Sequence, residues 1–154
     1  MLRSILALII LAAASHANGQ TSPPEQERWL CVTDAATGFS FDLESKRWRA
    51  THFRSEDKWI IRRPDENDIS RLKRMRQAKT PQWIVAHFGG GQTGGFCSDD
   101  FREDELTCGI FFGQLKFNRK LLRFITTVDF GYVTPVEIEG TDTPYMQIGR
   151  CSAF

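Results

Sequence analysis

The chain has 154 residues, of which 41% are hydrophobic and 12% aromatic, and this is enough for one domain with a substantial core. Lysine and arginine total 20 against 19 aspartate and glutamate residues, which gives a net charge of +1. This balance argues against a general nucleic-acid-binding protein, because such domains carry a clear basic excess.

Residues 1–17 have the pattern of a secretory signal peptide. Arg3 precedes a ten-residue apolar run, ILALIILAAA, and the segment ends in the small-x-small sequence Ser15-His16-Ala17. The run is shorter than the about 20 residues that a membrane-spanning helix needs, so we expect a cleaved leader and no membrane span. The sequence therefore predicts a soluble periplasmic or secreted protein whose cysteines can form disulfide bonds.

Residues 18–27 are polar and contain two prolines, which is typical of a flexible lead-in. From residue 28 to residue 154 we expect a single disulfide-bonded β domain. Short aromatic and β-branched runs alternate here with turn residues, and the first of them predict strands at 28–33, 39–43, 47–53 and 58–63. A break is expected at 34–38, and the alternation of Phe39, Phe41 and Leu43 predicts that these side chains share one face of a strand.

The second half of the chain carries the only helical signal. Acidic residues at the start of 65–79 and basic residues later favour a short helical insertion there. The remaining segments are then expected to be a strand at 82–88, a glycine-rich loop at 89–95, an acidic loop at 98–105, and strands at 106–117, 121–132 and 145–151.

About eight antiparallel strands predict an all-β fold, either a small barrel or a sandwich. The regular spacing of the first strands is typical of a meander and favours the barrel. The long connections at 64–81 and 89–105 leave the sandwich as the alternative.

The four cysteines allow three disulfide pairings. We expect Cys31 to pair with Cys151, because the first and last strands become neighbours when a meander closes on itself. Cys97 and Cys108 would then pair across a short loop. Their spacing contains no C-x-x-C, so it fits no zinc pattern, and we expect no metal site.

Catalytic motifs are scarce. Only His52 and His87 remain after the leader, no G-x-S-x-G sequence is present, and the glycine run at 89–95 lacks the lysine and helix of a phosphate-binding loop. We therefore expect no catalytic residues and no cofactor. The alternative is an enzyme resembling glycoside hydrolases, with a carboxylate pair drawn from the acidic loop: Asp99, Asp100, Glu103 and Asp104.

Residues 71–79, RLKRMRQAK, carry five basic side chains and no acidic one. Four of them are candidate contacts to an anionic partner: Arg71, Lys73, Arg74 and Arg76. The other interpretation is that this segment and the acidic residues at 99–105 neutralise each other.

Several short motifs carry a resemblance that spans most of the chain from residue 28. They are Trp29-x-Cys31, Thr37-Gly38-Phe39, Trp48, Phe53, Arg123-Phe124, Gly131-Tyr132-Val133, Asp142-Thr143-Pro144-Tyr145 and Ile148-Gly149-x-Cys151. Together they resemble a group of small exported bacterial proteins of unknown function, and this resemblance implies no activity. In size, leader and strand density the chain is also similar to the disulfide-bonded β-barrels that inhibit lysozyme in the bacterial envelope, although it has no Ser-Gly pair like that of their inhibitory loop.

These observations predict a non-enzymatic binding module of the cell envelope, whose loops contact an envelope protein or a small apolar ligand. The alternatives are an inhibitor of a hydrolase such as lysozyme, the carboxylate-dependent enzyme, and a structural protein without a ligand. The enzyme would need two carboxylates in a concave pocket. The structural protein would have a barrel interior packed solid.

Overall fold

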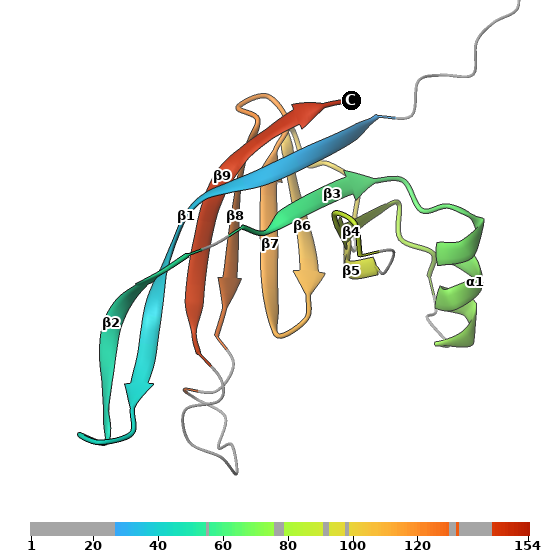
Figure 1. Ribbon diagram of the computed structural model, residues 1–154. Helices are drawn as coiled ribbons and strands as arrows, with labels where there is room; N and C mark the ends of the chain where they lie inside the picture. The colour runs from blue at the N-terminus through green and yellow to red at the C-terminus, as the bar shows by residue number, and fades with distance from the viewer. Residues whose placement is uncertain are drawn as a thin grey trace, which may run out of the picture.

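The computed structural model describes residues 27–54, 56–75, 79–90, 93–97, 99–129, 132 and 143–154. The expected leader at 1–17, nearly all of the lead-in at 18–27, and Arg76 lie outside these residues. The structure contains one nine-stranded antiparallel sheet and one helix in the described part of the chain (Figure 1). The elements are β1 (Arg28–Asp42), β2 (Arg47–Phe53), β3 (Lys58–Arg62), α1 (Glu66–Arg74), β4 (Trp83–His87), β5 (Thr93–Cys97), β6 (Glu105–Ile110), β7 (Gly113–Asn118), β8 (Arg123–Val128) and β9 (Tyr145–Ala153).

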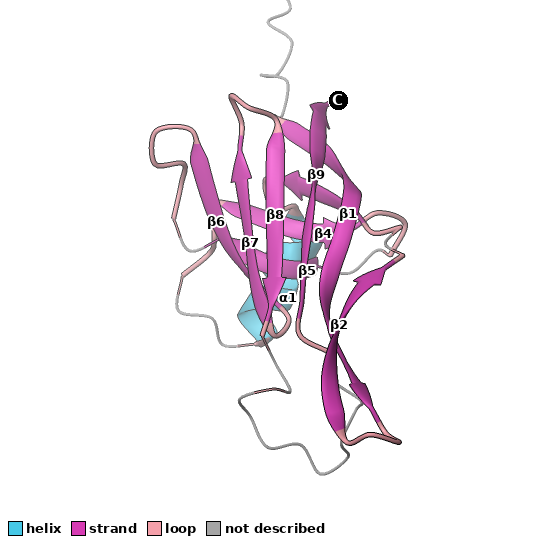
Figure 2. Cartoon of the chain, turned by 90° about the vertical axis from the view of Figure 1, so that its left-hand side faces the viewer, coloured by secondary structure: helices cyan, strands magenta, loops and turns pink. Residues whose placement is uncertain are grey.

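The sheet closes on itself because β1 pairs with β9 as well as with β3. The strand order β1-β3-β4-β5-β6-β7-β8-β9 therefore forms an eight-stranded barrel, and β2 lies outside it as a ninth strand. Figure 2 shows one wall of this barrel, with β6, β7, β8, β9 and β1 side by side. The all-β fold and the barrel are confirmed, and the sandwich alternative is wrong.

β1 is one continuous strand of 15 residues, so the break expected at 34–38 is wrong. The β1–β9 register shifts between Thr33 and Ala35, so β1 has one residue more than β9 at this point, as in a β-bulge. The strand continues beyond the shift. Beyond the barrel β1 pairs with β2, and the two form a hairpin that projects past the barrel wall (Figure 2). Phe39 and Leu43 lie in or next to this hairpin and are more than half exposed, so their alternation does not mark a core face.

Aromatic side chains fill one end of the barrel, which we call the closed end. The ring of Trp29 lies 5.3 Å from that of Trp83 and 5.1 Å from that of Phe117, and Phe101 contacts all three rings. Phe101 comes from the β5–β6 connection, so that loop covers this end of the core. Both disulfides, Cys31–Cys151 and Cys97–Cys108, join the same core and have the pairing expected from the sequence.

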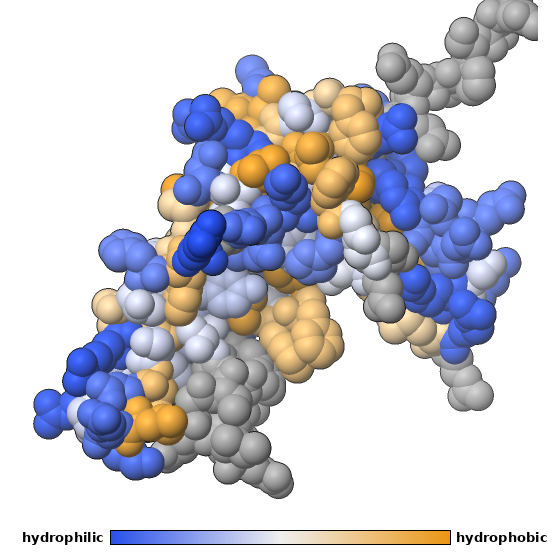
Figure 3. All heavy atoms as spheres, in the orientation of Figure 1, coloured by the Kyte–Doolittle hydropathy of each residue, from blue (hydrophilic) through white to orange (hydrophobic). Residues whose placement is uncertain are grey.

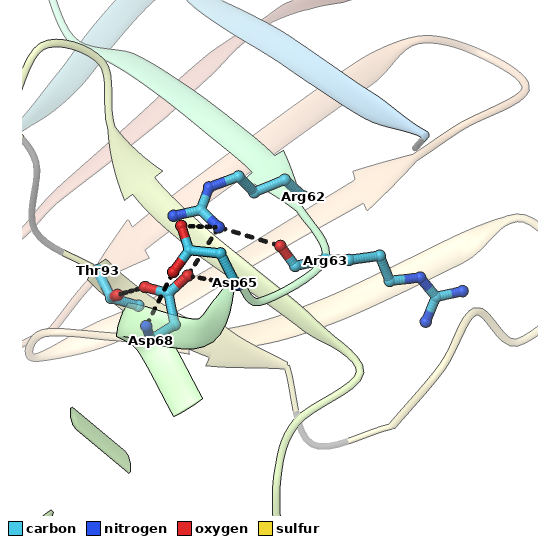
Figure 4. Close-up of polar contacts among 5 residues, drawn as sticks. All are labelled: Arg62, Arg63, Asp65, Asp68 and Thr93. Atoms are coloured by element: carbon cyan, nitrogen blue, oxygen red, sulfur yellow. Dashed lines mark hydrogen bonds and ion pairs between the residues drawn. The ribbon is translucent and has the colours of Figure 1, made fainter. Parts of the chain in front are cut away.

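α1 is shorter than the expected 65–79 helix and begins with a capping box. The Asp65 side chain accepts a hydrogen bond from the Asp68 backbone, and the Asp68 carboxylate accepts one from the Asp65 N–H. Asp68 also accepts hydrogen bonds from Arg62 at 2.7 Å and from Thr93 at 2.8 Å (Figure 4). One carboxylate therefore attaches the helix to both β3 and β5.

Several strands after α1 are shorter than expected, whereas β9 continues to Ala153. The 106–117 segment is a hairpin, β6–β7, rather than one strand, and its two-residue turn is Phe111-Phe112. The strand expected at 121–132 ends at Val128, and the last residues of the glycine-rich run form the start of β5 instead of a loop. The turn was not predicted because neither phenylalanine is a usual turn residue.

Phe112 adopts a φ of 60°, in the left-handed region that L-residues with a large side chain disfavour. We expect Phe112→Gly to raise the free energy of unfolding by about 1 kcal/mol, because glycine occupies this region without the Cβ clash. Urea denaturation of the two proteins measures the difference. An equal or lower midpoint would show that ring contacts of Phe112 outweigh the backbone strain.

Candidate binding cleft at the open end of the barrel

The opposite end of the barrel is open. The strand pairs that reach this end follow one another around the wall: Trp59–His87, Gly95–Ile110, Ile110–Gly113, Gly113–Val128 and Val128–Tyr145. A cleft of about 990 Å³ opens here, and its lining includes Asp57, Trp59, His87, Ile110 and Tyr145 together with Arg71 and Met75 of α1 and its C-cap. The barrel therefore ends in an open cleft on this side.

An aromatic pair forms one wall of this cleft. The rings of Trp59 and His87 come from neighbouring strands, and their centroids lie 4.0 Å apart. Gly94, in the adjoining strand β5, lies against this pair, and an added Cβ there would lie only 3.2 Å from the Trp59 ring and 3.5 Å from the His87 ring. Glycine at this position therefore leaves room beside a flat aromatic surface.

Three polar side chains form a hydrogen-bonded chain across the interior. The Thr126 hydroxyl donates to the Gln147 carbonyl at 3.1 Å, and the Gln147 amide donates to the Asp57 carboxylate at 2.6 Å. Thr126 and Gln147 are buried, one inward-facing step nearer the open end than the core residues Phe124 and Gly149. A buried polar network seldom adds stability over apolar packing, so its position beside a cleft points to a role in binding.

Tyr145 is the half-buried phenol at the rim of the cleft. Its burial, and then the negative charge of Asp57, raise its pKa above the ordinary value of 10.0. At neutral pH the phenol is therefore protonated and can donate a hydrogen bond to a bound molecule.

The chain has two tyrosines, so this shift can be tested by alkaline titration of their absorbance. We expect a titration step above pH 10, and we expect Tyr145→Phe to remove that step. Asp57→Asn should lower its midpoint without restoring the ordinary pKa, because burial is the larger cause. A late step that survives in Tyr145→Phe would contradict the assignment.

A second, more apolar cleft of about 630 Å³ lies between the projecting β1–β2 hairpin and the adjoining ends of β8 and β9. Its aromatic lining includes Phe39, Trp48 and Tyr132, and Tyr145 lines both clefts. The ring of Trp48 packs on Tyr132, with the centroids 5.5 Å apart. Apolar surface therefore continues outward from the open end along the hairpin.

The basic residues predicted from the sequence lie beside the first cleft. Arg71 lines it, whereas Lys73 and Arg74 are exposed on α1. None of the three makes an ion pair with another described residue. The acidic segment does not neutralise them, because the ion pairs of its carboxylates are with other basic residues: Asp99 with Arg102, Asp104 with Arg119, and Glu105 with Lys116.

The four carboxylates considered for catalysis do not form a concave site. Asp99, Asp100 and Glu103 are exposed, Asp104 is half-buried, and none of them lines either cleft. A hydrogen bond from the Trp83 indole at 2.7 Å holds the pKa of Asp100 below its usual value, which is opposite to what a general acid requires. Among the described residues, no cluster of three or more metal-ligating side chains is present.

Comparison of the chain with protein-family models, curated proteins and solved structures finds no match. The suspected similarities to small exported proteins and to lysozyme inhibitors therefore stay predictions. No helix in the described ranges is long and apolar enough to cross a membrane.

Apart from Arg71, the residues that line the open end are not singled out by the sequence. His87 is notable there only as one of two histidines after the leader, and its partner Trp59 lies on a separate strand. Asp57 lay in an expected turn and Tyr145 at the start of an expected strand. Only the barrel register brings these residues together.

Proposed function

We propose that this protein is a non-enzymatic binding module that holds a small amphipathic molecule in the open end of its barrel. The observation that carries the proposal is the polar chain from Thr126 through Gln147 to Asp57, which lies beside a cleft whose lining includes several aromatic side chains. The mouths of β-barrels are common binding sites, and such sites combine apolar walls with a few well-placed polar groups.

The two kinds of lining group divide the work of binding. The exposed ring of His87, which packs on the buried Trp59, offers a flat contact surface, while Asp57 and the Tyr145 hydroxyl orient a polar group of the ligand. Arg71 at the edge of the cleft would favour a ligand with an anionic or strongly polar end. We infer a molecule with a flat or chain-like apolar part and one polar head.

We further propose that the protein is exported. The pattern of residues 1–17 supports this proposal, and two disulfides suit an oxidising compartment. Edman sequencing of the protein released by a secreting host tests it. Cleavage after Ala17 is the expected result, and an intact N-terminus would contradict the proposal.

Binding can be tested with N-phenyl-1-naphthylamine, an uncharged aromatic dye, followed by native mass spectrometry after incubation with a mixed lipid extract. We expect the dye to fluoresce in the cleft and Gly94→Val to weaken its binding about tenfold, because the added side chain occupies space beside Trp59. Gln114→Val is the matched control, since it puts the same side chain on the exposed outer side of β7. The proposal is wrong if the wild-type protein binds no dye and retains no compound, or if both variants weaken binding equally.

A further inference from the structure

The β6–β7 turn exposes two phenylalanines at the open end of the barrel. Phe111 is 77% exposed and Phe112 is 44% exposed, and their rings lie 3.8 Å apart. Figure 3 shows hydrophobic spheres protruding at the place where Figure 1 draws this turn. Two-residue hairpin turns favour Asn-Gly or similar pairs. A Phe-Phe pair in which Phe112 has a φ of 60° is therefore less stable locally than such a turn.

Other exposed apolar side chains surround the same opening. Met75, the C-cap of α1, lines the cleft together with Phe111 and is more than half exposed. Phe88 follows β4 and is also more than half exposed, and its N–H donates to the Lys58 carbonyl at the start of β3. Exposed apolar side chains therefore project from three separate segments at one end of the molecule.

Basic side chains lie near these exposed apolar side chains. Arg71, Lys73 and Arg74 lie on the last turn of α1, and the Lys58 ammonium lies 6.0 Å from the centre of the Phe88 ring. Of the nearby acidic groups, Glu56 forms an ion pair with Arg54 at 3.0 Å. Asp57 accepts a hydrogen bond from the neutral Gln147 amide, which does not offset its charge, so it remains the one acidic side chain among the lining residues of the cleft.

We propose that the open end of the barrel docks on the surface of an anionic phospholipid bilayer. Phe111, Phe112 and Phe88 enter the boundary between headgroups and acyl chains, where aromatic side chains are well accommodated. The basic residues of α1, together with Lys58, contact the lipid phosphates.

A fluid bilayer fits this surface better than a protein partner does. The apolar side chains project from separate turns instead of forming one flat, continuous patch, and positive charge lies between them. Docked in this way, the cleft would face the bilayer. The inference does not depend on a ligand in the cleft. If the protein docks on vesicles but retains no ligand, this inference stands and the preceding proposal is wrong.

The test is co-sedimentation of the full chain with vesicles of phosphatidylcholine alone or with about 30% phosphatidylglycerol, whose anionic headgroups give the vesicle a negative surface potential. We expect Phe111→Asn/Phe112→Gly to weaken binding to the anionic vesicles about tenfold or more. The matched control is Leu121→Asn/Leu122→Gly in the β7–β8 turn at the other end of the barrel, where Leu121 is exposed and Leu122 also has a positive φ of 52°. All three proteins carry the same N-terminal residues, so the comparison isolates the two turns.

We expect the wild-type protein to bind neutral vesicles at least about tenfold more weakly, and Lys73→Glu/Arg74→Glu to reduce binding to the anionic ones. Circular dichroism and melting curves establish that each variant is folded. Equal binding to neutral and anionic vesicles, or an equal loss in the two turn variants, would overturn the inference. The inference would also be overturned if the wild-type protein self-associated and bound no vesicles, and if Phe111→Asn/Phe112→Gly abolished that self-association. The turn would then be a protein interface.

Discussion

Replacing Cys31 and Cys151 with alanine is expected to lower the free energy of unfolding by about 5 kcal/mol. The bond joins residues 120 positions apart, so it restricts nearly the whole domain in the unfolded state. The two cysteines face each other in the β1–β9 register, which is the pairing that closes the barrel. A loss of this size is comparable to the whole stability of many domains, which is about 5–15 kcal/mol. Urea denaturation under non-reducing conditions measures it.

The second disulfide provides the comparison. Cys97 and Cys108 lie only 11 positions apart, and replacing them should cost about 3 kcal/mol by the same reasoning. The order of the two effects is therefore the sharper prediction. A greater loss for the Cys97–Cys108 pair would show that the closing seam is held mainly by its backbone hydrogen bonds.

Replacing Asp68 with alanine is expected to lower the free energy of unfolding by about 3 kcal/mol, about as much as the loss of the second disulfide. The side chain is only 5% exposed and holds Arg62, Thr93 and the Asp65 N–H. Removing it leaves the partly buried Arg62 guanidinium without its shortest ion pair, since the remaining one to Asp65 is 3.3 Å long. Glu66→Gln removes a charge from the exposed first turn of the same helix and should cost little.

The same carboxylate predicts how stability depends on pH. Burial opposes the ionisation of Asp68, but hydrogen bonds from Asp65, Thr93 and Arg62 outweigh it and hold its pKa below the ordinary value of 3.8. The stabilisation is therefore present above about pH 4 and is lost as the pH falls through the lower pKa of the folded state. We expect the wild-type protein to lose more stability than Asp68→Asn between about pH 4 and pH 2. Parallel losses in the two proteins would assign acid unfolding to other groups.

The strand content, the closure of the barrel and both disulfides could be predicted because they follow from side-chain patterns and from cysteine positions. The course of β1 could not. Residues 34–38 contain Asp34, Thr37 and Gly38, which favour a turn in isolation. In the structure two neighbouring strands supply backbone partners along this segment, and a bulge accommodates it. Tertiary pairing therefore overrides the local preference.

The candidate site was less predictable than the fold. The basic residues of α1 were noticed because they form a run in the sequence, and Arg71 does line the cleft. Asp57, Trp59 and Tyr145 carry no such signal, because each is isolated within a turn or at the end of a strand. In the sequence, Thr126 and Gln147 are simply positions within expected strands. Only the β8–β9 register shows that they share a hydrogen bond inside the barrel.

The pairing of β1 with β9 also determines when the barrel can close. The first strand must remain without one of its two barrel neighbours until the last strand has been synthesised, since they meet through residues such as Cys31 and Cys151. Contacts between such distant segments form late and slowly in folding. During synthesis a growing chain of this topology has an open sheet with an unpaired edge. Chaperones bind such partly folded chains, which are prone to aggregate. The same delay keeps the chain unclosed and able to pass through a narrow channel, which suits the proposed export.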